Sequence, residues 1–214
     1  MPQDLADEPA TELLARVTTS HKSHYQIADE PFAIFPTWKW YALGNLVSVI
    51  GGVSYDKCDV TKNGIRILRG GNIQNGALLL ESDDVFLPTK YKDGENSIKK
   101  GDILIVGSTG SETLIGKAGF ALKDFEDTQI GAFLRIIRPR SADFIEYLHL
   151  IFKSDYYSNY IRGKAKGTTI NNIKIKDLTE FAVPIPPLNE QRRIVKTASE
   201  ILTITSNLQK QLTM

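Results

Sequence analysis

The residues that could carry catalysis lack the spacing that known catalytic motifs require. Residues 111–118 approach a phosphate-binding loop, but Ser111 stands where the first glycine is required, and Ala118 stands where a hydroxyl would hold Mg²⁺. Residues 107–110 place a serine between glycines without the spacing of a nucleophile elbow. The sequence therefore predicts neither a nucleotide-binding site nor the nucleophile of a hydrolase.

Metal and methyl-transfer chemistry are equally hard to place on this chain. His21 and His24 lie three residues apart without a third ligand nearby, and His149 stands alone. A single cysteine, Cys58, excludes both an internal disulfide and a cysteine-cluster zinc site. Residues 186–188 lack the flanking polar and aromatic residues of the Asn-Pro-Pro-Tyr motif of adenine methyltransferases. We predict a protein that is not an enzyme and that has neither a metal nor a cofactor of its own.

Two polar segments are instead typical of contacts with nucleic acid. Residues 69–76 carry a guanidinium and three amides on a glycine-rich backbone; arginine suits guanine, and asparagine and glutamine suit adenine, in the major groove. Residues 164–174 combine phosphate-seeking lysines with hydroxyls and amides. The same residue types are also common in ordinary turns. The candidate DNA-binding residues are Lys62, Arg69, Asn72, Gln74, Ser108, Thr109, Lys117, Lys164, Lys166, Thr168, Thr169, Asn171, Asn172 and Lys174.

The charge distribution favours the same interpretation, although the total charge does not. The chain has 26 basic and 25 acidic residues, for a net charge of +1. Residues 162–176 nevertheless carry several cations and no carboxylate, and so do residues 62–69. Acidic residues gather at the N-terminus and over residues 81–84. One positively charged face is therefore compatible with a near-neutral total, although a run of charge is also ordinary on a solvated surface.

Short apolar runs bounded by glycine or proline predict strands, and two stretches with helical spacing flank them. We expect an α+β fold with a short helix starting near Pro9 and a second helix from Ser141 to Arg162, capped by Ser141 and ended by Gly163. Residues 181–187 are too rich in proline for a helix or a central strand and predict an extended exit from the domain. The predicted strands are residues 65–68, 77–80, 103–106 and 133–137.

Length and composition predict one ordinary domain with an additional helix. We divide the chain into a short helix and linker over residues 1–30, the main domain over residues 31–188, and a C-terminal helix over residues 189–214. No apolar run approaches the roughly 18 residues that cross a bilayer, so we expect no membrane contact. The absence of paired cysteines is consistent with a cytoplasmic location.

The C-terminal helix has apolar positions separated alternately by four and three residues. Asn189 is a suitable cap for its first turn. This spacing is typical of a coiled-coil seam, which must face either a partner helix or a surface of its own domain. The pattern leaves both possibilities open, although the heptad spacing favours a homodimer. The seam consists of Ile194, Ala198, Ile201, Leu208 and Leu212.

Several segments together resemble the target-recognition domain in specificity subunits of type I restriction-modification systems. Residues 183–195, VPIPPLNEQRRIV, carry the most specific part of this resemblance, because a proline-rich exit, Glu-Gln and a helix start follow in the expected order. The resemblance covers about residues 31–202. Its other segments are residues 31–44, 64–76, 101–119, 130–139 and 166–182.

The resemblance implies a non-catalytic protein that recognises double-stranded DNA. In this family two recognition domains, held apart by paired helices, each read one half of a split site. Methyltransferase subunits dock on this scaffold and bind S-adenosylmethionine, and separate motor-nuclease restriction subunits cut unmodified DNA. This chain has one such domain, so it is either a half-subunit or a fragment. Two other classes stay open: an assembly module whose loops never contact DNA and, with less support, a nuclease.

Overall fold

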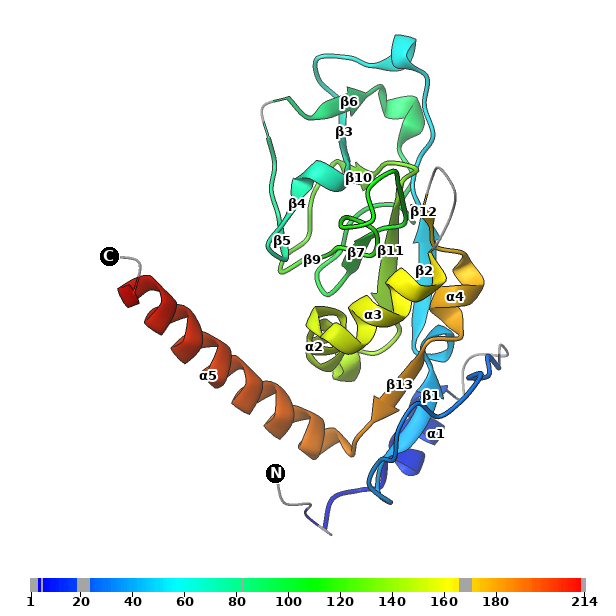
Figure 1. The fold of residues 1–214 in the computed structure, drawn as a ribbon. Helices are drawn as coiled ribbons and strands as arrows, with labels where there is room; N and C mark the ends of the chain where they lie inside the picture. The colour runs from blue at the N-terminus through cyan, green and yellow to red at the C-terminus, as the bar shows by residue number, and fades with distance from the viewer. Residues whose placement is uncertain (1–3, 5, 19–23, 82, 166–170, 213–214) are drawn as a thin grey trace.

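The computed structural model describes residues 4, 6–18, 24–81, 83–165 and 171–212, and these residues form the predicted α+β fold (Figure 1). A four-stranded antiparallel sheet in the order β2-β11-β7-β9 lies at its centre. All four side chains of β7 are buried, because other elements cover both faces of this strand. The strands of this sheet are β2 (Val47–Gly51), β7 (Ile103–Val106), β9 (Ala118–Phe120) and β11 (Leu134–Pro139).

A second sheet has three strands in the order β10-β3-β6, and β10 runs parallel to β3. Next to it, β4 and β5 form a hairpin whose two turn residues, Asn75 and Gly76, have φ angles of 49° and 80°. Asn-Gly is the preferred pair for such a turn, since both positions require positive φ. The strands are β3 (Ile65–Leu68), β4 (Ile73–Gln74), β5 (Ala77–Leu78), β6 (Val85–Leu87) and β10 (Thr128–Ile130).

The proline-rich exit is more deeply buried than the sequence suggested. It contains β13 (Ala182–Ile185), whose four residues are all buried and which pairs with β1 (Lys39–Ala42) in a two-stranded antiparallel sheet. Pro184 lies opposite Trp40 in this pairing. A two-stranded sheet tolerates proline, because only one edge of each strand needs its N–H groups.

The predicted helix over residues 141–162 is two helices. Ser141 does act as a cap, but for a 3₁₀ turn over Ala142–Phe144, where its hydroxyl accepts from the N–H of Asp143. The first helix ends before Ser154. The Ser154 hydroxyl accepts from the N–H of Tyr157 and caps the start of a second helix. Gly163 does not end that helix, which continues to Lys164. The two helices are α2 (Ile145–Lys153) and α3 (Asp155–Lys164).

The N-terminal helix α1 (Ala10–Thr18) belongs to the main core. Leu13 and Leu14 are buried in the same cluster as side chains from α2 and α3. Further along, the main-chain N–H and C=O of Tyr25 bond the side-chain amide of Asn45. The described part of residues 1–30 therefore packs onto the body of the domain.

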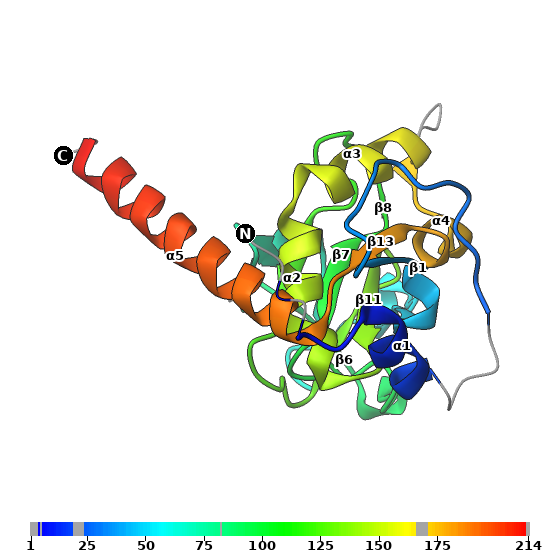
Figure 2. The same cartoon turned by 90° about the horizontal axis from the view of Figure 1, so that it is seen from below.

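The C-terminal helix α5 (Leu188–Leu212) leaves the body at its N-terminal end and projects away from it (Figures 1 and 2). It begins one residue before Asn189, so Asn189 lies inside the first turn and is not the cap. The N–H of Gln191 donates to the carbonyl of Pro187 at 2.9 Å, which closes that first turn. Among the described helices, α5 included, none is both long and apolar enough to cross a membrane.

Candidate nucleic-acid interface

Long-range strand pairing brings candidate DNA-binding residues from two separate segments of the chain together. The short strands β8 (Ser108–Thr109) and β12 (Asn171–Asn172) pair antiparallel, with Asn171 opposite Thr109 and Asn172 opposite Ser108. The next residue extends the contact, since the N–H of Ile173 donates to the carbonyl of Gly107 at 2.9 Å. Four residues predicted from separate segments thus lie side by side. We call them the polar strand pair.

The members of the polar strand pair differ in exposure. Asn171 is buried, Ser108 and Thr109 are partly buried, and Asn172 is exposed. Lys174 is also exposed, and it lies where β12 leads into α4 (Ile175–Thr179). Asn172 and Lys174 therefore present an amide and a cation to solvent from the same short segment.

A loop without any predicted DNA contact adjoins the polar strand pair. The carbonyl of Phe133 accepts from the N–H groups of Gly107 and Ser108, at 2.8 and 3.1 Å. Phe133 is 68% exposed. The strand predicted over residues 133–137 included Phe133, but β11 begins at Leu134. The sequence did contain a signal for the exposure of Phe133. Side chains alternate between the two faces of an extended segment, so Phe133 points away from the face on which Leu134 and Ile136 are buried.

A cavity of about 300 Å³ opens beside this loop. Residues 131–134 line one side, and residues 53–55 with Lys57 line another. Arg69, a predicted DNA contact, also lines it. Tyr55 and Phe133 supply rings, whereas Lys57 and Arg69 supply positive charge.

Asn72 has a different role from the one that the sequence suggested. Its side chain is buried; its Oδ1 accepts from the N–H of Arg69 at 2.7 Å, and its Nδ2 donates to the carbonyl of Leu79 and to Asp84 Oδ1, at 3.0 and 2.5 Å. These bonds hold the loop over residues 69–72 in place. The geometry gives Asn72 a positioning role, in place of the predicted contact with adenine.

The basic run over residues 62–69 is compensated by acidic residues that follow it in the chain. Pairing of β3 with β6 brings Arg66 onto Asp84, and the two side chains form an ion pair. Burial by itself would raise the pKa of Asp84, but hydrogen bonds from Asn72 and Arg66 hold this pKa below its usual value. The expectation of an uncompensated positive charge was therefore wrong for this segment.

The surface next to Asn72 is consequently less favourable for phosphate. A cavity of about 410 Å³ is lined there by Arg69, Gly71 and Asn72 together with three acidic residues, Glu81, Asp83 and Asp84. Gln74 is exposed next to this cavity. Its Nε2 donates two long hydrogen bonds, to Gly71 O at 3.3 Å and to Glu81 Oε1 at 3.4 Å. Gln74 is thus free to exchange these long bonds for others.

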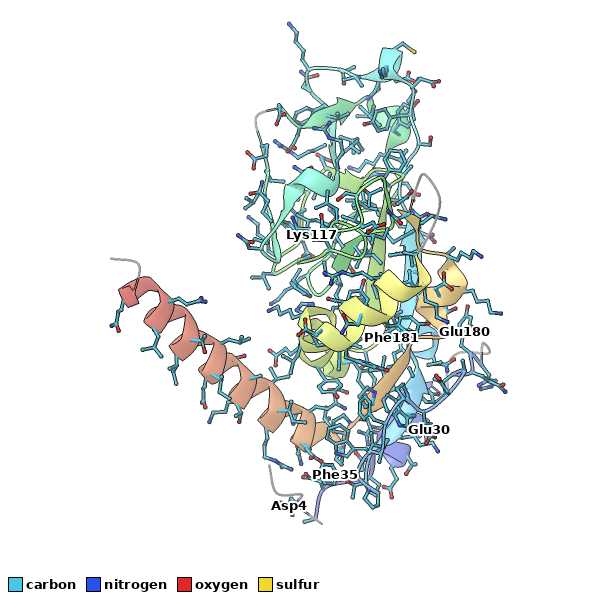
Figure 3. The ribbon with its side chains drawn as sticks, in the orientation of Figure 1. Asp4, Glu30, Phe35, Lys117, Glu180 and Phe181 are labelled. Carbon is cyan, nitrogen blue, oxygen red and sulfur yellow. The ribbon has the colours of Figure 1, made fainter. Side chains whose placement is uncertain are left out.

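The remaining predicted contacts are dispersed. Lys62 is exposed ahead of β3. Lys117 (Figure 3) lines a separate cavity of about 200 Å³, and Ser158 and Arg162 of α3 line it too. Lys164 is exposed at the end of α3, with its Nζ 5.5 Å from the ring centre of Tyr160. Lys166, Thr168 and Thr169 lie outside the described residues.

Comparison with known proteins matches this arrangement to one family. Residues 36–214 match the type I restriction modification DNA specificity domain. The chain belongs to this family. It is 31% identical over 169 residues to the EcoKI specificity subunit of Escherichia coli K12, and likewise 31% identical over 169 residues to the StySPI specificity subunit of Salmonella potsdam. Each alignment covers 77% of this chain and 36% of the relative.

Solved structures share the fold of this DNA specificity domain. The HsdS subunit of Thermoanaerobacter tengcongensis superposes with a TM-score of 0.63 at 21% identity, over 94% of this chain and 45% of that one. The chain thus spans little more than a third of the curated relatives and under half of this structure. In the described part of the domain, no group of three or more His, Cys, Asp or Glu side chains is placed to hold a metal ion.

Proposed function

We propose that this domain recognises one half of a bipartite site in double-stranded DNA, as a specificity subunit of a type I restriction-modification system does. The observation that carries the proposal is the meeting of the polar strand pair with the loop over residues 131–135, in a chain of the DNA specificity family. Sequence recognition needs amides and hydroxyls near base edges and cations near phosphates. Asn172 and Lys174, both exposed, supply both kinds of group from one short segment.

The chain itself carries out no chemistry in this proposal. Methyltransferase subunits would bind S-adenosylmethionine and modify the DNA, and restriction subunits would cut it, with the specificity domain choosing the site in the cytoplasm. The incomplete phosphate-binding motif over residues 111–118 supports this division of labour.

We further propose that α5 pairs with a second helix of the same kind. Ile201 and Leu208 on the projecting part of α5 are 57% and 55% exposed, which is unusual for large apolar side chains at heptad spacing. A second copy of this chain, related by a two-fold axis, would cover both seams and present two recognition domains to a split palindrome.

Titration of labelled duplex DNA at several salt concentrations tests DNA recognition. A domain that contacts phosphates gives a steep negative slope of log affinity against log salt, whereas an assembly module without DNA contact gives no binding or a flat slope. Lys174→Ala should make the slope shallower by about 0.9, the value for one phosphate. Lys39→Ala is the matched control, because Lys39 is exposed on β1, away from the polar strand pair.

Mapping of methylated adenines tests the same proposal in cells. A genome that carries this chain with its methyltransferase subunit should acquire methylation at one defined bipartite sequence. Methylation at unrelated sequences, or at the same sequences without this chain, would contradict a role in site selection.

A further inference from the structure

Phe133 is an exposed aromatic residue on a loop that the surrounding structure holds rigidly. Its carbonyl accepts two main-chain hydrogen bonds, from Gly107 and Ser108. Arg135 Nη1 donates to the carbonyls of Ala132 and Leu134, both at 2.7 Å. With these bonds on both sides of Phe133, the backbone that carries the ring has little freedom.

The backbone of residues 52–53 lies very close to the backbone of residues 130–131, next to the Phe133 loop. Val53 forms a parallel bridge with Gly131, and its N–H donates to the carbonyl of Ile130 at 2.9 Å. A Cβ atom on Gly52 would lie only 2.1 Å from the carbonyl oxygen of Gly131, so a side chain cannot be accommodated there. Glycine at position 52 thus allows the segment that carries Tyr55 to lie against the Phe133 loop.

The other exposed phenylalanines pack directly against aromatic rings, and Phe133 has no such ring–ring contact within the described residues. The ring of Phe32 lies 4.8 Å from Trp40, and that of Phe35 lies 5.8 Å from Trp38. Phe133, at 68% exposure, is also the most exposed of the three. Exposure of a large ring on a stiff loop costs solvation free energy that a partner surface would recover.

The chemistry around the ring indicates what that partner is. The cavity beside Phe133 also contains the Tyr55 ring, and Lys57 and Arg69 line it. Aromatic rings combined with cations are typical of sites that stack bases and hold the neighbouring phosphates. The loop is continuous with the polar strand pair through the bonds to Phe133 O, so it belongs to the surface that we propose for DNA.

We propose that Phe133 stacks on a base that has left the duplex stack, with the cavity beside it receiving that base. This inference rests on the proposed function. It gives Phe133 a role in binding distorted DNA, whatever the sequence of that DNA. Stacking on an aromatic ring is tolerant of base identity, because every base has a π face. A duplex with an unpaired base should bind more tightly than a fully paired one, because the unstacking cost has already been met.

Binding of two labelled duplexes by the full chain tests this proposal. The duplexes have the same sequence, but one contains a single unpaired thymine at its centre. We expect tighter binding of the duplex with the unpaired base, and we expect Phe133→Ala to remove a preference of roughly 5- to 150-fold. Phe133→Trp should retain the preference, since a larger ring also stacks.

Phe35→Ala is the matched control, because it removes an equally apolar residue that is 51% exposed and lies near the start of α5 (Figure 3). It should behave like the unmodified chain. Equal affinity of the unmodified chain for both duplexes, or a preference that survives Phe133→Ala, would overturn the stacking role. Salt-dependent binding of the paired duplex would still support the proposed function in that case. Absence of binding to either duplex would overturn both.

A protein partner is the competing occupant for this surface. If Phe133→Ala weakened assembly with the methyltransferase subunit and left the preference for the unpaired base intact, Phe133 would belong to a subunit interface. That result would also overturn the proposal.

Discussion

The two parts of α5 share one heptad pattern but have opposite surroundings. In the anchored part, residues 188–198, Ile194 and Val195 pack against the main core, and Glu190 and Gln191 are buried. In the bare part, residues 199–212, the described large apolar side chains are more than half exposed, as Ile201 is. The sequence pattern left a partner helix and the helix's own domain as alternatives, and the structure assigns the first half of the seam to the domain.

The anchoring depends on polar contacts that a hydrophobic pattern does not reveal. Trp38 Nε1 donates to Glu190 Oε2 at 3.0 Å, and Gln191 Nε2 donates to the carbonyl of Pro186 at 2.8 Å. Arg193 pairs with Asp7, which precedes α1. These contacts set the direction in which the bare part projects. The comparison therefore separates residues that orient the helix from residues that remain available to a partner.

The largest effect expected from this comparison is on association. Ile201→Asp would place a carboxylate in the exposed seam of each copy, and each isoleucine buried in a dimer contributes about 1.5–3 kcal/mol. For the two copies together, we expect a shift of about 3–6 kcal/mol in dimerisation, with an unchanged free energy of unfolding of the domain. Sedimentation equilibrium over a range of concentrations measures this shift.

Thr203→Asp is the control for that variant, because it introduces the same charge on an exposed residue outside the seam. It should dimerise as the unmodified chain does. If the unmodified chain stayed monomeric throughout the micromolar range, or if Ile201→Asp still dimerised, the pairing of α5 would have to be abandoned.

An isoleucine-to-aspartate substitution in the anchored part should instead weaken the folding of the domain. Ile194→Asp would place a charge against the main core, where its desolvation is not compensated. We expect a loss of about 2–4 kcal/mol in the free energy of unfolding. Denaturant titration followed by circular dichroism measures it. Equal stability of Ile194→Asp and Ile201→Asp would show that the two parts of α5 do not differ as the structure indicates.

Gln191→Ala should have a smaller effect on stability. The substitution removes the bond to Pro186 and leaves that buried carbonyl without its partner, at a cost of about 1–3 kcal/mol. Denaturant titration measures this cost, and the affinity of the folded variant for a DNA half-site should be unchanged. A loss of half-site binding larger than the loss of stability would indicate that Gln191 acts on the recognition surface itself.

The smallest expected effect is on the stability of the domain at acidic pH. The hydrogen bond from Arg193 lowers the pKa of Asp7 in the folded chain. A carboxylate with a depressed pKa contributes stability above its unfolded value of about 3.9, and this contribution is lost as the pH falls through the folded value. Asp7→Asn should therefore flatten the dependence of the unfolding midpoint on pH below about 5. If the unmodified chain and Asp7→Asn had the same pH dependence, the pairing of Asp7 with Arg193 would not contribute to the anchoring of α5.

The candidate DNA-binding segments show what local sequence patterns could not predict. Asn72 and Asn172 are the same residue type in similar polar contexts, yet one is buried and the other exposed. The difference arises because β6 brings Asp84 against the loop that contains Asn72, whereas β12 forms a short pair with β8. Neither neighbour is near in sequence, so composition and local spacing could not separate the two asparagines.

The sequence by itself determined the features that depend on local periodicity and on family motifs. Alternation and apolar runs located the strands at residues 65–68 and 103–106, and helical spacing located α1 and α5. These signals depend on neighbours within a few residues, which the chain always carries with it. The VPIPPLNEQRRIV segment identified the family for the same reason.

Only the tertiary structure decided which polar groups meet and which are already occupied. Formation of the polar strand pair, the pairing of Arg66 with Asp84, and the cavity beside Phe133 each require contacts between segments far apart in the chain. The free energy of such a contact depends on burial and on the geometry of both partners. A one-dimensional pattern contains neither quantity, so it named the candidate residues but could not place them.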